Sequence, residues 1–216
     1  MVEKKNQEKR QRVVSLDFAD EVYDKLRNRG VLFLDGEEVN VFESGSFYRD
    51  LFFLAMSGWP KEKPIWVVLN SPGGSADQCF AICDSILSFT RSGYTINVLG
   101  VGEVASAAVI ILQTGTRRYA LENTRFLAHQ VRQGSLFHEE EVTQGEERVA
   151  EMKRVNKQAC AIVAKRTGMD LAVLFGKISK TDLYMSAEDA MKFGTHGLID
   201  EICPIFPFMD VLEGLT

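Results

Sequence analysis

The sequence has few cysteines for its length, four in 216 residues, and none of them belongs to a C-x-x-C pair. Such a small set does not form a disulfide framework, so we expect the thiols to be reduced. Cys79 and Cys83 lie four residues apart on an expected helix and would share one face, as two ligands of a metal site would. No histidine or further cysteine lies nearby in the sequence, which favours small buried hydrophobic side chains and predicts no metal site.

The sequence also lacks a long apolar run and an excess of basic residues. Its most apolar window, 104–112, is about half of the roughly 18 residues that a membrane helix needs. The first fifteen residues are charged and contain no signal-peptide core, and the net charge is −5. We therefore expect a cytoplasmic protein without a membrane segment. Nucleic acid is a poor partner because no basic field would attract its phosphates.

Two motifs of common enzyme classes are missing. No G-x-x-x-x-G-K-[ST] occurs, so the chain is not expected to hydrolyse ATP itself. The glycines of a G-x-S-x-G elbow are absent around Ser106, so an α/β-hydrolase is not indicated.

Strand-like and helix-like segments alternate along the chain and predict an α/β fold. Short apolar runs that end at turn residues predict strands, and apolar residues at helical spacing predict helices. The expected strands are 31–34, 65–69, 94–101, 117–121 and 125–128. The expected helices are 18–29, 43–57, 76–91, 104–112, 138–167, 170–179 and a short one after the capping box 186–189. No repeat or linker divides the chain, so we expect one domain, 18–216, after a charged leader, 1–17.

The longest expected helix, 138–167, would extend roughly 45 Å, farther than a small domain. Its apolar stripe is interrupted, and Gly145 weakens the helix locally. A surface that contacts a partner is a natural use for such a helix.

Three polar residues are candidates for chemistry, although each also has an ordinary structural interpretation. Ser106 could cap or pack, His129 could be a structural histidine, and Asp182 could cap a turn. However, Gly73 and Gly74 follow a buried strand, where backbone N–H groups without a nearby Cβ can approach a substrate oxyanion. A serine at a strand-to-helix junction projects from the carboxyl edge of the sheet, where open α/β sheets bind ligands.

Five motifs together make a specific resemblance, because their order and separations agree across about residues 29–203. They resemble those of the Clp protease proteolytic-subunit family. The motifs are Asn70-Ser71-Pro72-Gly73-Gly74, Gly102-Glu103-Val104-Ala105-Ser106, Ala128-His129-Gln130, Asp182-Leu183-Tyr184-Met185-Ser186-Ala187 and Gly197-Leu198-Ile199-Asp200.

The resemblance implies a crotonase-like α/β fold with repeated β-β-α units, in which 138–167 is the projecting handle helix. It implies that Ser106 is the nucleophile of a serine endopeptidase, His129 its general base and Asp182 the carboxylate that orients the histidine. The oxyanion donors would be the backbone N–H groups of Gly74 and Ala107. An extended peptide would add as a strand along one segment of the chain. The expected substrate-binding residues are Gly73, Val131, Arg132, Gln133 and Gly134.

The resemblance also implies partners and no cofactor. We expect heptameric rings, joined in pairs by the handle helix, that degrade unfolded polypeptides delivered by an unfolding ATPase of the AAA+ type. The leader 1–17 would correspond to the axial pore loops.

Departures from the family pattern keep other hypotheses open. Ala107 follows the nucleophile where the family usually has methionine, and Val131 replaces a common proline, which leaves a backbone donor there. One alternative is a non-catalytic or latent structural subunit of a mixed ring. Another is an acyl-CoA enzyme of the crotonase fold, which would need a basic CoA-phosphate site but not Ser106.

Overall fold

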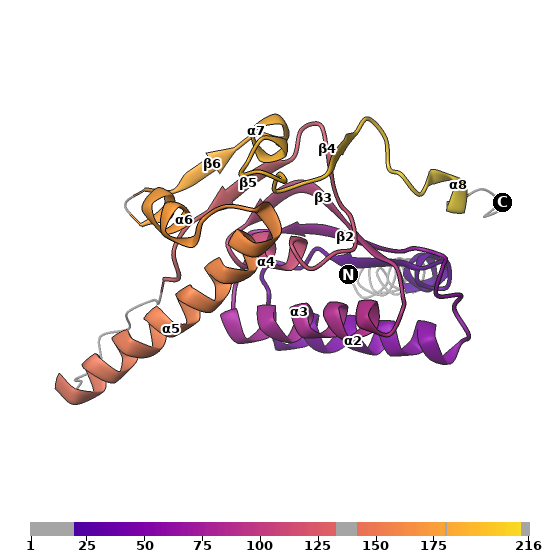
Figure 1. Cartoon of the computed structure of the whole chain (residues 1–216). Coiled ribbons are helices and arrows are strands. Elements are labelled where there is room, and N and C mark those ends of the chain that lie inside the picture. Colours follow the sequence, from indigo (N-terminus) through magenta and orange to yellow (C-terminus); the bar gives the residue numbers. More distant parts are fainter. Residues whose placement is uncertain (1–19, 133–141, 180, 213–216) are drawn as a thin grey trace, which may run out of the picture.

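The computed structural model describes residues 20–132, 142–179 and 181–212, which form one mixed α/β body with a projecting helix (Figure 1). A helix over residues 20–27 precedes the first strand. The strands are β1 (Val31–Leu34), β2 (Ile65–Ser71), β3 (Ile96–Ala105), β4 (Arg118–Leu121), β5 (Arg125–Ala128), β6 (Leu183–Met185) and β7 (Glu201–Cys203). The other helices are α2 (Val41–Met56), α3 (Ala76–Arg91), α4 (Ala107–Leu112), α5 (Val142–Thr167), α6 (Leu171–Ile178), α7 (Ala187–Met191) and α8 (Met209–Leu212).

The sheet is mainly parallel, which confirms the predicted α/β class. Its main path runs β1-β2-β3-β4-β7, and every pair on this path is parallel. β5 branches from this path: it pairs in parallel with the end of β3 and antiparallel with β6. The carboxyl ends of β2, β3 and β5 therefore meet at one edge of the sheet. The expected β-β-α order occurs at β4-β5-α5, whereas β1, β2 and β3 are each followed directly by a helix.

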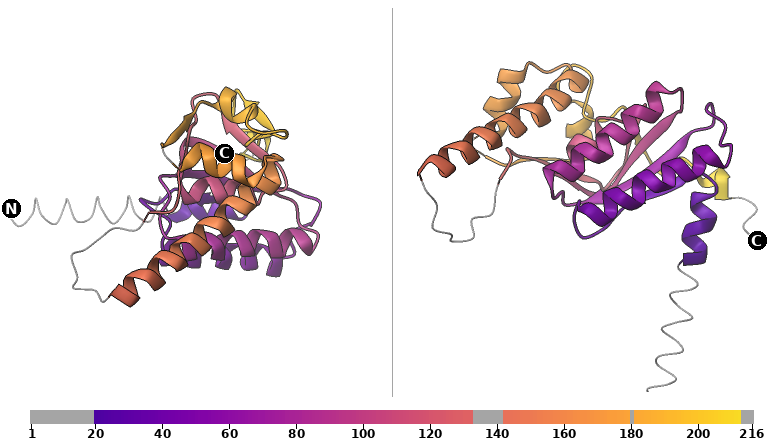
Figure 2. Two further views of the ribbon diagram at one scale, coloured as in Figure 1. Left: turned by 60° about the vertical axis from the view of Figure 1, so that its left-hand side comes forward. Right: turned by 90° about the horizontal axis from the view of Figure 1, so that it is seen from below.

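Alternate residues of the strands pack into two cores, one on each face of the sheet. In β2, Val67 and Leu69 belong to the larger core, and Trp66 and Val68 to the smaller one. The larger core lies under α2, α3, α4 and the end of α5, and Figures 1 and 2 show α2 and α3 side by side. The smaller core includes Phe208 of the C-terminal segment. Burial on both faces explains the continuous apolar run of β2.

Side-chain caps fix where several helices begin. The Asn40 side chain accepts hydrogen bonds from two N–H groups of the first turn of α2, and Asp170 does the same for α6. Ser186 and Asp189 form the predicted capping box of α7. Each cap satisfies N–H groups that have no partner inside the helix.

The long helix α5 projects from the body, as predicted (Figures 1 and 2). Its 26 residues extend about 39 Å, and residues 138–141 of the expected helix lie outside the described part of the chain. Residues of its last two turns, such as Cys160 and Val163, are buried in the larger core, whereas residues 146–151 are exposed. Among the described residues, no helix is both long and apolar enough to cross a membrane.

One predicted boundary is wrong in a way that matters for function. The sequence predicts a strand over 94–101 and a helix from 104, but β3 continues to Ala105 and α4 begins at Ala107. The reason is tertiary pairing: Glu103, Val104 and Ala105 form a parallel ladder with β5. Ser106 is consequently the single residue between the strand and the helix, rather than a residue inside a helix.

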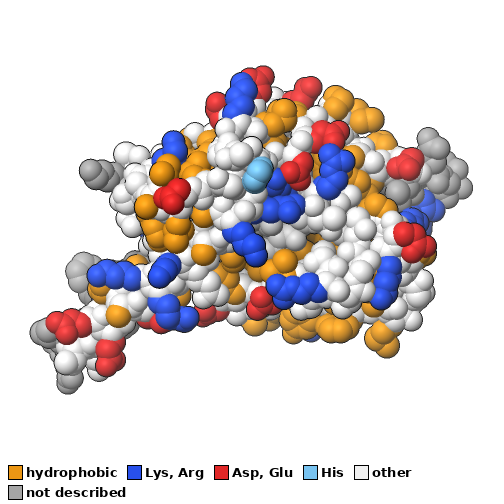
Figure 3. All heavy atoms as spheres, in the orientation of Figure 1, with side chains coloured by type: hydrophobic (Ala, Val, Ile, Leu, Met, Phe, Trp, Pro, Cys, Tyr) orange, Lys and Arg blue, Asp and Glu red, His pale blue; other side chains and the backbone are white. Residues whose placement is uncertain are grey.

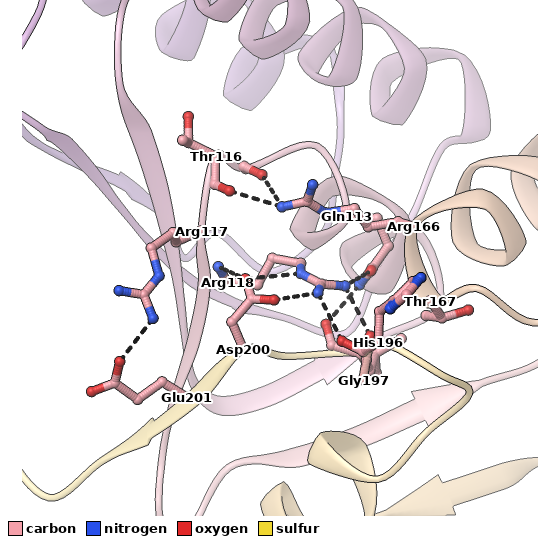
Figure 4. A network of polar contacts seen from close by, with 12 residues as sticks. Gln113, Thr116, Arg117, Arg118, Arg166, Thr167, His196, Gly197, Asp200 and Glu201 are labelled. Atoms are coloured by element: carbon pink, nitrogen blue, oxygen red, sulfur yellow. Dashed lines mark hydrogen bonds and ion pairs between the residues drawn. The ribbon is translucent and has the colours of Figure 1, made fainter.

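A buried arginine joins the sheet to the C-terminal segment (Figure 4). The Arg118 side chain is 2% exposed and forms an ion pair with Asp200. It also donates to Gln113 Oε1 at 2.8 Å and to the carbonyl of Gly197 at 2.9 Å. Burial by itself would raise the pKa of Asp200, but the hydrogen bonds from Arg118 outweigh it and lower the pKa. The charge of Asp200 therefore stabilises the folded chain.

We predict that Asp200→Asn lowers the free energy of unfolding by about 3 kcal/mol, because it leaves the buried Arg118 charge without its carboxylate. Because folding lowers the pKa of Asp200, this contribution is complete above the pKa of the unfolded carboxyl, about 3.9, and is lost as the pH falls through the folded value. Urea denaturation at fixed protein concentration, from pH 7 down to pH 3, measures both effects.

The matched control is Glu201→Gln, which removes the partner of the exposed Arg117. Exposed ion pairs contribute little, so we expect a loss below about 1 kcal/mol. Equal losses for the two variants at pH 7 would contradict a special role for the buried pair.

Candidate active site

Ser106 occupies a strained turn at the carboxyl edge of the sheet. Its φ of 54° and ψ of −118° make it the only described residue besides glycine with a positive φ. Such a conformation costs about 1–3 kcal/mol and persists only where the surroundings impose it. Here its backbone N–H donates to the carbonyl of Leu127 in β5 at 2.8 Å. The pairing of β3 with β5 thus holds the serine in place.

A glycine loop after β2 approaches this turn so closely that a side chain cannot fit. A Cβ at Gly73 would lie 2.6 Å from the Cβ of Ser106 and 2.9 Å from the backbone nitrogen of Ala107. A Cβ at Gly74 would lie 2.5 Å from the carbonyl oxygen of Val39. Both glycines also have positive φ, so the backbone conformation and the packing each require glycine.

The backbone N–H groups of Gly74 and Ala107 are among those at this turn that have no acceptor in the described part of the chain. Ala107 begins α4, where the first N–H groups have no partner inside the helix. Both residues line the same cavity as Ser106. The two groups predicted as oxyanion donors thus lie at the candidate site without a hydrogen-bond acceptor.

The cavity beside Ser106 is small, about 80 Å³, and mainly apolar. It lies between the end of the sheet, α4, α5 and α6. Its lining residues, besides Gly74, Ser106 and Ala107, are Ala76, Phe80, Val109, Ile110, Ala128, His129, Val131, Arg132, Asn156, Ala159, Cys160, Val163, Leu174 and Ile178. Such a pocket suits an apolar side chain of a ligand.

The cavity contains a second possible nucleophile, the thiol of Cys160. Burial raises the pKa of this thiol to about 11. Because the thiolate is the reactive form of cysteine, the side chain is inert at neutral pH. Cys79 and Cys83 are also buried and free, as predicted, and Cys79 Sγ donates to the carbonyl of Ala107 at 3.4 Å. Ser106 is thus the better nucleophile candidate in the cavity.

His129 follows β5 and lines the cavity together with Ser106. Its Nδ1 lies 2.7 Å from the carbonyl oxygen of Gln130. Because a carbonyl oxygen only accepts, this hydrogen bond assigns the proton of a neutral ring to Nδ1. Nε2 then carries the lone pair that a general base needs.

Asp182 and His129 flank the paired ends of β6 and β5, and no hydrogen bond joins them. β5 and β6 are antiparallel, and their last pair is Ala128 with Leu183; His129 is the next residue after β5, and Asp182 is the residue before β6. The Asp182 carboxylate instead forms an ion pair with Arg132. No hydrogen bond joins Ser106 to His129 or His129 to Asp182, all of which are described. The structure thus brings the three predicted residues to one edge of the sheet without linking them.

The segment after His129 is fixed by two further hydrogen bonds. The Gln130 side chain donates to the carbonyl of Ser179 at 3.2 Å. The Val131 N–H donates to Asn156 Oδ1 of α5 at 3.0 Å. The sequence suggested a backbone donor at Val131 where the family commonly has proline, and in this arrangement the handle helix uses that donor.

The other predicted binding residues fall into two groups. Gly73 and Arg132 lie at the candidate site, whereas Gln133 and Gly134 lie outside the described residues. The pairing of Arg132 with Asp182 was not predicted. Its only signal in the sequence is that opposite charges follow β5 and precede β6, and this becomes informative once the strands are known to pair.

Comparison with known proteins agrees with the resemblance of the motifs. The family model described as Clp protease matches residues 15–205. The ATP-dependent Clp protease proteolytic subunit 2 of Treponema denticola is 32% identical over 177 residues, which cover 81% of this chain and 84% of that protein. The ATP-dependent Clp protease proteolytic subunit 1 of Rhodococcus jostii is 31% identical over 182 residues, which cover 83% and 77%. The chain therefore belongs to the Clp protease family.

Proposed function

We propose that the chain is a serine endopeptidase subunit of a ring-shaped, self-compartmentalised protease that cleaves unfolded polypeptides delivered by an AAA+ ATPase. The observation that carries this proposal is the strained turn at Ser106, with the unpartnered N–H groups of Gly74 and Ala107 beside it and His129 across the same cavity. Family membership supports the same chemistry, because the two relatives are named proteolytic subunits.

In the proposed reaction, Ser106 Oγ attacks the carbonyl carbon of a peptide bond and transfers its proton to His129 Nε2. The hydrogen bond from His129 Nδ1 to Gln130 supports this role, since it leaves Nε2 unprotonated. The Gly74 and Ala107 N–H groups stabilise the oxyanion. His129 then protonates the leaving amine, and water hydrolyses the acyl-enzyme on Ser106. In the active arrangement, the Asp182 carboxylate replaces the Gln130 carbonyl as the acceptor of the hydrogen bond from His129 Nδ1.

Substrate binding is proposed to combine strand addition with the apolar cavity. Gly73 and the segment that begins at Val131 would align the peptide main chain, and the cavity would accept the side chain next to the cut. Main-chain pairing does not depend on sequence, so the enzyme would tolerate many substrates.

Assembly into rings is supported by an exposed apolar stripe on α2. Val41, Tyr48, Phe52 and Met56 lie on one face at helical spacing and are 60%, 39%, 56% and 87% exposed, respectively. Figure 3 shows hydrophobic side chains along the lower edge of the molecule, where α2 and α3 lie in Figure 1. A stripe of this kind is typical of an interaction surface. We propose that neighbouring protomers cover it.

A latent or non-catalytic subunit of a mixed ring is the second candidate. The ion pair of Asp182 with Arg132 favours it, because His129 lacks its carboxylate partner in this arrangement. Activity measurements separate the two candidates. In contrast, an acyl-CoA enzyme gives no reason for the placement of Ser106 and His129 at one cavity.

We predict that the purified protein hydrolyses short fluorogenic peptides and that Ser106→Ala reduces the rate by about 10⁶-fold, below detection, because the nucleophile is lost. Native mass spectrometry of the same samples is expected to give the mass of about fourteen chains for both proteins. Ser88→Ala, at an exposed serine on α3, is the control and should retain full activity. A ring-sized particle without activity would favour the latent subunit. An active monomer would contradict the proposal that the protease encloses its active sites in a ring.

We also predict that Met56→Glu dissociates the ring, because it places a charge at the most exposed position of the α2 stripe. Native mass spectrometry should show protomers or small oligomers, and circular dichroism should show the unchanged protomer fold. Met56→Leu keeps the apolar character and should assemble normally. Intact rings of Met56→Glu would show that the stripe is not a protomer contact.

A further inference from the structure

Arg132 is the one residue with a permanent charge among the described residues that line the cavity. Its side chain is 61% exposed, and that of Asp182 is 27% exposed. An anionic group of a ligand that entered the cavity would therefore meet Arg132 as its nearest cation. The same arginine already holds the carboxylate that His129 lacks.

The exchange of partners by Asp182 requires little movement. Ala128 and Leu183 form the last pair of the β5–β6 ladder, and His129 and Asp182 are the adjoining residues of these two chain segments. Directly opposite residues of an antiparallel pair have Cβ atoms about 4.5–5.5 Å apart, so these two residues adjoin a point where the two segments are close. The backbone around them is fixed by the bonds of Gln130 to Ser179 and of Val131 to Asn156. The exchange that we consider is therefore a rotation of the Asp182 side chain from Arg132 toward His129.

The preference of Asp182 for Arg132 over His129 is easily shifted. An ion pair as exposed as that of Arg132 with Asp182 is weak, and salt screens it further. A carboxylate on a bound peptide competes directly for the guanidinium of Arg132. Once Arg132 is occupied, Asp182 is free to accept the Nδ1 hydrogen bond of His129, which the Gln130 carbonyl otherwise accepts.

We infer that Arg132 is a positioning residue that withholds Asp182 from His129, and that an acidic side chain of the bound peptide releases Asp182 by taking Arg132. The inference rests on the proposed roles of Ser106, His129 and Asp182. Arg132 would then have two roles. It acts as a latch, by which we mean that its ion pair keeps Asp182 away from His129. It also determines specificity, because the enzyme favours peptides with an acidic residue near the cut.

The first test measures how fast a fluorophosphonate labels Ser106 in the assembled protein without substrate. Arg132→Gln should accelerate labelling about fivefold or more, through the maximal rate and not the affinity for the probe. Arg132→Lys keeps the charge and should restore slow labelling. Added salt should accelerate labelling of the wild type but not of Arg132→Gln. Arg117→Gln, which breaks another ion pair with an exposed arginine, is the matched control and should label as the wild type does.

A double variant tests whether the effect passes through Asp182. In an Asp182→Asn background, Arg132→Gln should no longer accelerate labelling, because no carboxylate is left to release. An acceleration that persists in this background would overturn the latch. So would unchanged or slower labelling in Arg132→Gln.

The second test compares peptides that carry one Glu, or Gln at the same position, on either side of the cut. The wild type should cleave at least one Glu peptide several-fold faster at saturation than its Gln counterpart, and Arg132→Gln should cleave the two equally fast. A preference that survives in Arg132→Gln, or no preference at any position, would overturn the specificity role. If Ser106→Ala labels as well as the wild type, the proposed peptidase function fails. Labelling that requires Ser106 but ignores Arg132 rejects the latch alone.

Discussion

The contact between the Gly73 loop and the Ser106 turn constrains the whole candidate site. Two backbone segments approach so closely that no side chain fits between them, and the serine adopts a positive φ that few residues tolerate. The parallel pairing of β3 with β2 on one side and with β5 on the other imposes this geometry. As a consequence, two N–H groups without acceptors lie next to the serine, which is the arrangement that oxyanion stabilisation needs.

The branch of the sheet at β5 has a comparable effect on the other two candidate residues. Because β5 pairs with β3, it places His129 at the cavity, and because it pairs with β6, it brings the segment that begins with Asp182 to the same edge of the sheet. The handle helix contributes as well: Asn156 binds the backbone after β5, and Cys160 and Val163 line the cavity. The helix proposed to join rings therefore also forms a wall of the site. A movement of α5 would shift the backbone next to His129.

The sequence predicted the α/β class and most elements to within a few residues, since each has its own periodicity and turn residues. For example, the Pro64-bounded run of β2, the capping box of α7 and the projecting α5 are all present. The boundary after β3 was wrong because residues 104 and 105 belong to the apolar window 104–112, which predicts one helix, and only the ladder with β5 shows that they are a strand. The branch at β5 could not be predicted, because no local pattern specifies which strands become neighbours.

By itself, the sequence determined which residue types are available for chemistry and in what order they occur. The motifs alone identify the glycines at 73 and 74, the serine at 106, the histidine at 129 and the aspartate at 182 as candidates. Only the tertiary structure decided their hydrogen-bond partners. The β5–β6 pairing ends next to His129 and Asp182, yet Asp182 pairs with Arg132. Charges compete at short range, and the outcome depends on side-chain positions. Such distances arise from packing between segments that are far apart in the chain, and a sequence pattern does not contain them.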